Sequence, residues 1–439
     1  MMDTRGRRTA DSAALSRRGF LGAAGAATAG LAAPGLAGCA TAPDEGGGQS
    51  KGNGEVTIYW NAGHVYDAYT KVIEDFEKDH GVTVQWQKFQ WPDMLTKLTA
   101  DFSAGNVPDL VEEPGGWVVQ FALTGDVLSL QPYLEKDGPA MGFPDDWLPF
   151  TVEHNTVDGE VFGIQQHLTC LLHFYNKAMF AKAGISGPPT TWDEFLETAK
   201  ALTGDGVHGV ALNALAFYGW PWLLQDGVSY FDPATKEVMV PRGAAVEGLQ
   251  FQVDLVHKHK VSPVPVVTPD YSTPRKLMAA ERAAMMISGP WDLAPLREAS
   301  PDLDFGIHQA LSSERQATAA SGTSLFIPKK AKNPDLAWDL IKRITAVDVE
   351  LAVTEEADMT MPRKSWARNE AVRSNPTLNA FAQGLEYSID WMEDLARSGA
   401  RGPVDETWIS TYEQILIQGK PVEETLRTFS ASAQKALSQ

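Results

Sequence analysis

Residues 56–113 read VTIYWNAGHVYDAYTKVIEDFEKDHGVTVQWQKFQWPDMLTKLTADFSAGNVPDLVEE and decide the fold class. Three stretches of this segment have the apolar character of strands, and two stretches repeat apolar residues with the helical period. The expected strands cover residues 56–60, 82–89 and 109–112, and the expected helices cover residues 66–78 and 91–104. Gly81, shortly after the first helix, and Gly105, directly after the second, end them. Strand and helix alternate, which predicts parallel βαβ units covered by helices on both faces.

The rest of the chain continues the same alternation, so the predicted fold class is α/β. Strands are expected over residues 161–164, 168–175, 283–287, 305–308 and 324–327. Helices are expected over residues 191–202, 246–258, 273–280 and 334–344, and over most of the chain after 369, with loops at 399–403 and 419–421. The sequence shows no internal repeat and no second hydrophobic segment after the N-terminal one.

The first 39 residues have the pattern of an export signal. Arg17 and Arg18 precede an uncharged run rich in Gly, Ala and Leu, which ends in Leu-Ala-Gly-Cys at residues 36–39. A twin-arginine pair before such a run is an export address rather than a fold element. The last four residues resemble the lipobox of bacterial lipoproteins, and an ordinary cleaved signal with a chance cysteine is the alternative. We expect residues 1–38 to be the signal peptide, Cys39 to be lipidated, and the Gly-rich residues 39–55 to form a flexible tether.

Charge and cysteine content exclude several kinds of partner. The formal net charge is −19, and removal of residues 1–38 takes away five arginines but only two aspartates. A chain this acidic is a poor ligand for nucleic acid and for anionic lipid, so the lipid anchor is the expected contact with the membrane. Cys170 is the one cysteine after Cys39 and is expected to be a small buried residue.

Five blocks spread over the chain resemble bacterial extracellular solute-binding proteins of the sugar-binding type, the relatives of maltose-binding protein that serve ABC importers. The blocks are FEKDHGVTVQWQKFQWPDMLTKLTADFSAGNVPDLVEE (76–113), DGEVFGIQQHLTCLLHFYNKAMFAKAG (158–184), PPTTWDEFLETAKALT (188–203), LMAAERAAMMISGPWDL (277–293) and SGTSLFIPKKAKNPDLAWDLIKRI (321–344). The resemblance implies two α/β lobes, each a mainly parallel sheet flanked by helices, with the ligand in the cleft between them. The implied lobes are residues 56–166 with 312–346, and residues 167–311 with 347–439.

The implied function is capture of a mono- or oligosaccharide outside the cytoplasmic membrane and its delivery to the permease subunits of an ABC transporter. The resemblance implies a monomer without catalytic activity, cofactor or metal. An aromatic ring suits the C–H face of a sugar, while polar groups bind its hydroxyls. Tryptophans in expected loops are therefore candidate sugar platforms, whereas Trp86, Trp192 and Trp338 lie in periodic apolar patterns and are expected in the core.

Site residues follow from the resemblance position by position. Trp291, in SGPWDL, is the strongest, because relatives commonly stack a sugar on a tryptophan there. Of Glu112 and Glu113, which follow PDLV, we favour Glu113. His167 is equally compatible with ligand contact and with an ordinary hydrogen-bonded strand histidine. At the MPRKS loop the chain has Met359-Thr360-Met361 where relatives often have Gly-aromatic-Leu, so Asp358 is a replacement polar contact. The full predicted ligand-binding set is Asn61, His64, Glu113, Trp117, His167, Tyr218, Trp220, Trp222, Trp291, Gly322, Thr323, Asp358 and Arg363.

Three other functions are alternatives to solute capture. An exported glycoside hydrolase needs two carboxylates across the scissile bond, and no stretch singles out such a pair. A zinc enzyme is disfavoured because His257 and His259 have one-residue spacing and no His-Glu-x-x-His occurs. A binding protein for iron or polyamine is the third alternative, since aromatic rings also cage cations. No Gly-x-Ser-x-Gly elbow or phosphate-binding Gly-rich loop is present.

Overall fold

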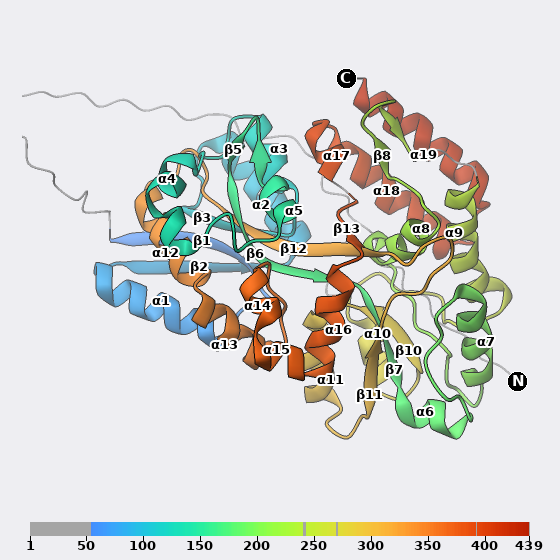
Figure 1. Cartoon of the computed structure of the whole chain (residues 1–439). Coiled ribbons are helices and arrows are strands. Elements are labelled where there is room, and N and C mark those ends of the chain that lie inside the picture. Colours follow the sequence, from blue (N-terminus) through green and yellow to red (C-terminus); the bar gives the residue numbers. More distant parts are fainter. Residues whose placement is uncertain (1–53, 240–242, 269–270, 392, 439) are drawn as a thin grey trace, which may run out of the picture. The chain divides into compact units, whose positions relative to one another are not determined.

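The computed structural model describes residues 54–239, 243–268, 271–391 and 393–438 (Figure 1). The signal peptide, Cys39 and nearly all of the tether lie outside these ranges, so the predictions for them stay predictions. Across the described ranges, no helix combines the length and the apolar character needed to cross a membrane.

A six-stranded sheet contains the first three predicted strands. Its strands are β1 (Glu55–Asn61), β2 (Thr83–Phe89), β3 (Leu110–Glu113), β6 (Gly163–Cys170), β12 (Thr318–Phe326) and β13 (Ser388–Ile389). They lie in the order β13-β12-β3-β1-β2, and β6 pairs with β12. The central strand β1 is parallel to both β2 and β3, which confirms the predicted βαβ units.

Helices cover both faces of this sheet. Successive side chains of β1 point to opposite faces, so β1 packs against helices on both sides. Ile58 and Trp60 join one core with the first set of helices, and Tyr59 joins another core with the second set. The first set is α1 (Asp67–His80), α12 (Pro334–Ile344) and α13 (Val347–Ala357); the second is α2 (Trp91–Ala104) and α3 (Trp117–Leu123). Gly81 ends α1 in the left-handed conformation, with φ 65°, as the sequence predicted.

Strands β6 and β12 connect the two halves of the molecule. Along β12, Ala319 packs in the core of the second half, whereas Leu325 packs in the core of the first. Along β6, Ile164 belongs to the first core, and the chain passes into the second sheet at Leu171, directly after Cys170. These two strands pair with each other, so they pass side by side from one half of the molecule into the other.

The second sheet differs from the prediction. Its strands are β7 (Leu172–Asn176), β10 (Met285–Ser288) and β11 (Phe305–His308), in the order β10-β7-β11. Both pairings are antiparallel, so the expectation of a mainly parallel second sheet was wrong. The physical reason is that alternation of strand and helix does not fix the direction of the returning strand: several helices separate β7 from β10, yet β10 runs opposite to β7.

The second half is built mainly from helices around a large aromatic core. Its elements are α6 (Lys177–Lys182), α7 (Trp192–Leu202), η1 (Ala216–Gly219), α8 (Trp220–Gln225), β8 (Phe231–Asp232), β9 (Glu237–Val238), α9 (Ala244–Val253), η2 (Asp254–Lys258), α10 (Thr273–Ala279), η3 (Pro290–Asp292), α11 (Leu293–Ala299), α17 (Glu393–Arg397), α18 (Arg401–Leu416) and α19 (Val422–Leu437). The predicted loop at 399–403 was partly wrong, because α18 begins at Arg401. Pro403 lies in the first helical turn, where a missing N–H group is tolerated.

The remaining elements bear on the predicted lobe limits. They are α4 (Gln131–Met141), α5 (Pro149–Glu153), β4 (Thr156–Val157), β5 (Glu160–Val161), α14 (Lys364–Arg368), α15 (Glu370–Ser374) and α16 (Pro376–Leu385). Val353, Trp366 and Leu378 pack in the core of β1 and α1, although the predicted limits assign them to lobe 2. We therefore propose that lobe 1 extends beyond residue 346; the other lobe limits stay as the sequence predicted them.

Candidate functional site

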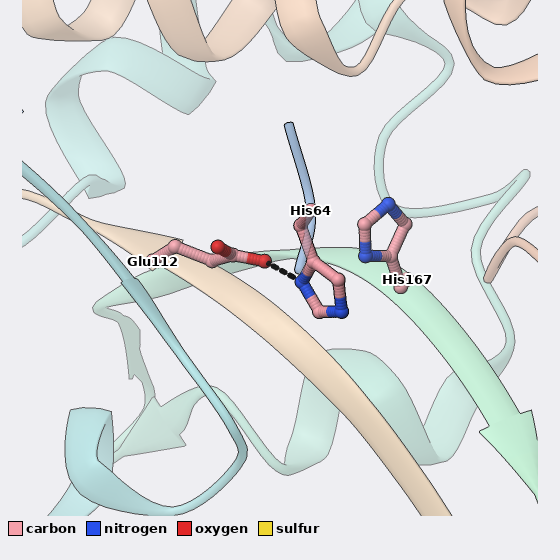
Figure 2. A group of neighbouring side chains, drawn as sticks. All are labelled: His64, Glu112 and His167. Carbon is pink, nitrogen blue, oxygen red and sulfur yellow. Dashed lines mark hydrogen bonds and ion pairs between the residues drawn. The ribbon is translucent and has the colours of Figure 1, made fainter. Parts of the chain in front are cut away.

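Three buried side chains meet beside the sheet of the first half: His64 after β1, Glu112 on β3 and His167 on β6 (Figure 2). Their exposed fractions are 7%, 0% and 1%. The His64 Nδ1 atom lies 2.6 Å from the Glu112 Oε1 atom, and the two histidine rings meet edge to face with centroids 5.1 Å apart. We call these three residues the His–Glu–His cluster.

Hydrogen bonds hold each member of the cluster in place. The other carboxylate oxygen of Glu112 accepts from the backbone N–H of Asn61 at 2.8 Å. The His167 ring is bonded on both sides, at Nε2 by the Tyr69 hydroxyl (2.7 Å) and at Nδ1 by the Thr323 hydroxyl (3.0 Å). Burial, with a smaller contribution from the neighbouring His64, lowers the pKa of His167 well below its usual value. The His167 imidazole is therefore neutral at neutral pH.

A second polar cluster surrounds Glu113, the next residue of β3. One Glu113 oxygen accepts from the backbone N–H groups of Gly115 (2.8 Å) and Trp117 (2.9 Å). Its Oε1 atom is buried and has no hydrogen-bond partner among the described residues. Burial raises the pKa of Glu113, while the nearby His154 lowers it. His154 in turn is bonded to Asp390, which follows β13.

Arg401, at the start of α18, reaches this cluster from the second half. A Cβ atom on Gly116 would lie 1.2 Å from an Arg401 guanidinium nitrogen, and the φ angle of Gly116 is 85°. Glycine is therefore required there on both counts. His154, Asp390 and Arg401 were not predicted as site residues, because each comes from a different element and none belongs to a recognisable motif.

Trp291 lies between the two halves. It is half-buried and packs against both the first core and the large aromatic core of the second half. Its indole N–H donates to the Tyr218 hydroxyl at 3.2 Å, and the two rings meet nearly perpendicular to each other. The short helix η3 that carries Trp291 is held by Asp292, which accepts from Ser288 and pairs with Arg275.

Trp220 and Trp222 are packing residues instead. Both are fully buried, with 0% and 1% exposure. The Trp220 ring stacks on Trp391 with centroids 4.2 Å apart and is covered by Trp408 of α18. The structure therefore gives no support for ligand contact at these two positions. The physical reason is that a helix almost 190 residues later in the chain covers this aromatic segment.

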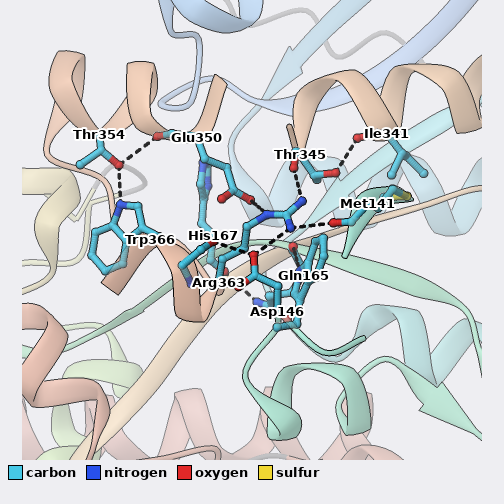
Figure 3. A network of polar contacts seen from close by, with 12 residues as sticks. Met141, Asp146, Gln165, His167, Ile341, Thr345, Glu350, Thr354, Arg363 and Trp366 are labelled. Carbon is cyan, nitrogen blue, oxygen red and sulfur yellow. Dashed lines mark hydrogen bonds and ion pairs between the residues drawn. The ribbon is translucent and has the colours of Figure 1, made fainter. Parts of the chain in front are cut away.

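Arg363 also has a structural role (Figure 3). Its buried guanidinium donates to the carboxylates of Glu350 (3.1 Å) and Asp146 (3.2 Å) and to the backbone carbonyl oxygens of Met141 (2.9 Å) and Thr345 (2.6 Å). It also lies 3.6 Å from the centroid of the Trp147 ring. Every one of these contacts is internal, so the geometry does not favour the predicted ligand contact for Arg363.

Two other predicted positions have clear local roles. Asp358 ends α13 in the left-handed conformation and forms an ion pair with Arg297 of α11, so it links the two halves. Gly322 lies on β12 opposite Leu168 of β6, and a Cβ atom there would come within 2.3 Å of the His167 carbonyl oxygen. The close approach of β6 and β12 therefore accounts for the glycine at position 322, and no ligand contact is needed to explain it.

The structure thus brings Asn61, His64, His167 and Thr323 together, but around Glu112 rather than the favoured Glu113. Glu113 lies next to Trp117 in a separate cluster, and Tyr218 lies with Trp291. Two residues were missed: Tyr69, which bonds to His167, and Gln166, whose Oε1 atom lies 3.5 Å from the Thr323 hydroxyl oxygen. Tyr69 fitted the apolar pattern of its helix, so nothing in the sequence marked it as a site residue. Gln166 is the direct neighbour of the predicted His167 and could have been predicted with it.

A family model described as bacterial extracellular solute-binding protein matches residues 62–349. The chain belongs to this family. A binding protein of Brucella abortus is 25% identical over 330 residues, which cover 71% of this chain and 77% of the relative. The maltotriose-binding protein of Pyrococcus abyssi is 23% identical over 332 residues, which cover 72% and 69%. The family is one of binding proteins that work outside the cytoplasm.

A solved structure confirms the two-lobe fold. An ABC transporter solute-binding protein of Thermotoga lettingae, bound with α-D-tagatose, has a TM-score of 0.78 and 25% sequence identity. The match covers 87% of this chain and 99% of the other. In a two-lobe binding protein the ligand-binding cleft lies between the lobes. Trp291, which contacts both cores, and Asp358, which is paired with Arg297, lie where the two halves meet.

Proposed function

We propose that this solute-binding protein captures a mono- or oligosaccharide outside the cytoplasmic membrane and delivers it to the permease of an ABC importer. One observation carries the carbohydrate assignment: the half-buried Trp291 ring packs against both cores, where the family binds its solute. A flat aromatic surface of this kind matches the C–H face of a sugar ring. The protein acts by binding and closing, not by catalysis.

Unpaired polar atoms supply groups for the sugar hydroxyls. The Asn61 Nδ2, Gln166 Nε2 and Glu113 Oε1 atoms are buried and lack hydrogen-bond partners among the described residues. A buried polar group without a partner costs about 1–3 kcal/mol, which a ligand hydroxyl would offset. Two of the atoms donate and one accepts, and a hydroxyl group can do both. The proposed contacts are therefore Asn61, Glu113, Gln166, Tyr218 and Trp291.

The named relatives support a sugar as the solute. The Pyrococcus abyssi relative is a maltotriose-binding protein, and the Thermotoga lettingae structure contains α-D-tagatose. A galactooligosaccharide-binding protein of Bacillus subtilis is also similar, at 21% identity over 351 residues. Because these sugars differ in stereochemistry and length, the chain is assigned a carbohydrate as a class.

We expect a thermal-shift screen to identify the sugar. The purified protein is heated with monosaccharides and with malto-, cello-, galacto- and arabino-oligosaccharides. A ligand that binds only the folded state at 100 times its dissociation constant adds about 2.7 kcal/mol to the free energy of unfolding. One sugar class should raise the midpoint without being cleaved on prolonged incubation. Cleavage of that sugar would instead indicate a hydrolase, and no shift with any sugar would contradict the carbohydrate assignment.

We further propose that the protein is a monomer anchored to the cell membrane by a lipid on Cys39, as the Leu-Ala-Gly-Cys sequence suggests. Cys39→Ala should move the protein from the membrane fraction to the medium or leave it unprocessed. The matched control is Cys170→Ala, since Cys170 is buried and free and its loss should leave the anchor intact. A wild-type protein without lipid at residue 39 in mass spectrometry would contradict the anchor.

A further inference from the structure

We propose that the His–Glu–His cluster of His64, Glu112 and His167 is a binding site for a divalent late first-row metal ion such as zinc. One ligand atom from each of the three side chains lies within 4.8 Å of the others, and all three residues are buried. The sequence predicted no metal site, because the three residues come from a loop and two strands and show no ligand spacing. The inference does not rest on the proposed carbohydrate function.

The donor set decides the class of ion. Two imidazole nitrogens and one carboxylate oxygen suit zinc and its neighbours, whereas calcium and magnesium prefer oxygen ligands alone. Two ligand atoms about 2 Å from a tetrahedral zinc ion lie roughly 3.3 Å apart. The separations within 4.8 Å therefore need only small side-chain movements to reach this geometry.

An ion must displace hydrogen bonds of the cluster. Each ring nitrogen of His167 is held by a hydroxyl group, Nε2 by Tyr69 and Nδ1 by Thr323. In the tautomer that carries its proton on Nε2, rotation of the Thr323 side chain about its Cα–Cβ bond frees the Nδ1 lone pair for a metal. The His64 Nδ1 and Glu112 Oε1 atoms lie 2.6 Å apart, and an ion that enters between these two groups replaces their hydrogen bond.

The groups around the cluster are arranged to orient its members. The backbone N–H of Asn61 fixes the Glu112 carboxylate, and Asn61 itself accepts from the N–H of Gly63 at 2.7 Å. Such outer contacts commonly hold metal ligands in position. Three protein ligands leave a fourth position for water, as in zinc sites that remain open.

Isothermal titration with zinc chloride tests the site in chelator-treated, sugar-free protein. One zinc ion should bind per chain. His64→Gln and His167→Gln should each weaken zinc binding roughly 100-fold or more. Each variant removes a metal ligand, so the loss should be at least as large as the loss caused by removing a residue that only positions a ligand. His173→Gln is the matched control: His173 is equally buried and stacks on His308, but it lies outside the cluster.

Absence of zinc binding by the wild-type protein would overturn the proposal, as would equal zinc binding by the double variant His64→Gln, His167→Gln. Circular dichroism checks that the variants fold. If they do not, crystals of the unaltered protein grown with zinc decide the question by anomalous scattering. An anomalous peak between His64, Glu112 and His167 supports the site, and peaks confined to other places overturn it. Sugar binding by a protein without zinc affinity would leave the proposed function standing.

Discussion

Replacement of Arg363 by methionine is expected to lower the free energy of unfolding at about pH 9, where Glu350 is ionised, by about 3–5 kcal/mol, the usual cost of removing one partner from a buried ion pair. The change leaves Glu350 buried without its cation and removes the donors of two carbonyl oxygens, those of Met141 and Thr345. Methionine fills a similar volume, so the effect is mainly electrostatic. Chemical denaturation followed by circular dichroism measures it.

The loss of stability caused by Arg363→Met should depend on pH. Burial raises the pKa of Glu350 to about 8, and Arg363 lowers it only in part. A carboxyl group whose pKa is higher in the folded than in the unfolded chain loses stability as the pH rises between the two values. In the wild type this interval runs from 4.5 to about 8. Without Arg363 the folded pKa rises further, so the difference between the variant and the wild type should be larger at about pH 9 than at about pH 6.

Two comparisons make the Arg363 result specific. The double variant Arg363→Met, Glu350→Leu should recover part of the lost stability, because no unpaired buried carboxyl remains. If Arg363 instead contacted the solute, as the sequence predicted, the single variant would weaken solute binding and keep its stability. An unchanged denaturation midpoint for Arg363→Met would therefore contradict the structural role.

Trp291→Ala is expected to weaken sugar binding by about 2–4 kcal/mol, or roughly 30- to 1,000-fold in affinity. The reason is loss of the aromatic face that lies between the two cores. Trp291 is half-buried, so most of the protein's packing should survive its removal. Calorimetry with the sugar found in the thermal-shift screen gives the affinity of the variant and of the wild type.

Trp338→Ala is the matched control. Trp338 is buried in the first core, where its indole N–H donates to Asp137 at 2.8 Å. Its loss should cost about 3–5 kcal/mol of stability without a selective effect on sugar affinity. Equal affinity of Trp291→Ala and the wild type would contradict the proposed platform, and it would weaken the case for Tyr218, which bonds to the same indole.

Local signals explain why much of the fold could be predicted. The bounds of α2, α12 and β11 match the expected ranges. In each helix the decisive residue is a neighbour in sequence: Gly105 adopts φ 74° at the end of α2, and Pro334 opens α12. Packing of β1 between two helical layers likewise follows from its alternating side chains.

The site was harder to predict, because it depends on which distant segments meet. Trp220, Trp222 and Trp291 all lie in aromatic or loop-like stretches, and all three were predicted to contact the ligand, Trp291 most strongly. Helix α18 and Trp391 cover Trp220, whereas Trp291 stays partly exposed between two cores. The sequence likewise did not show which of Glu112 and Glu113 lies beside His64 and His167. Neighbouring residues of a strand point to opposite faces, and only the sheet decides which face His64 and His167 share.

By itself, the sequence determined the α/β class, most helix and strand positions and the solute-binding family, because these depend on local periodicity, capping residues and motif order. Tertiary structure alone decided the antiparallel second sheet, the internal role of Arg363 and the meeting of His64, Glu112 and His167. Each of these features joins residues far apart in the chain. Which of such residues come into contact is set by packing of the whole molecule, and no local pattern encodes it.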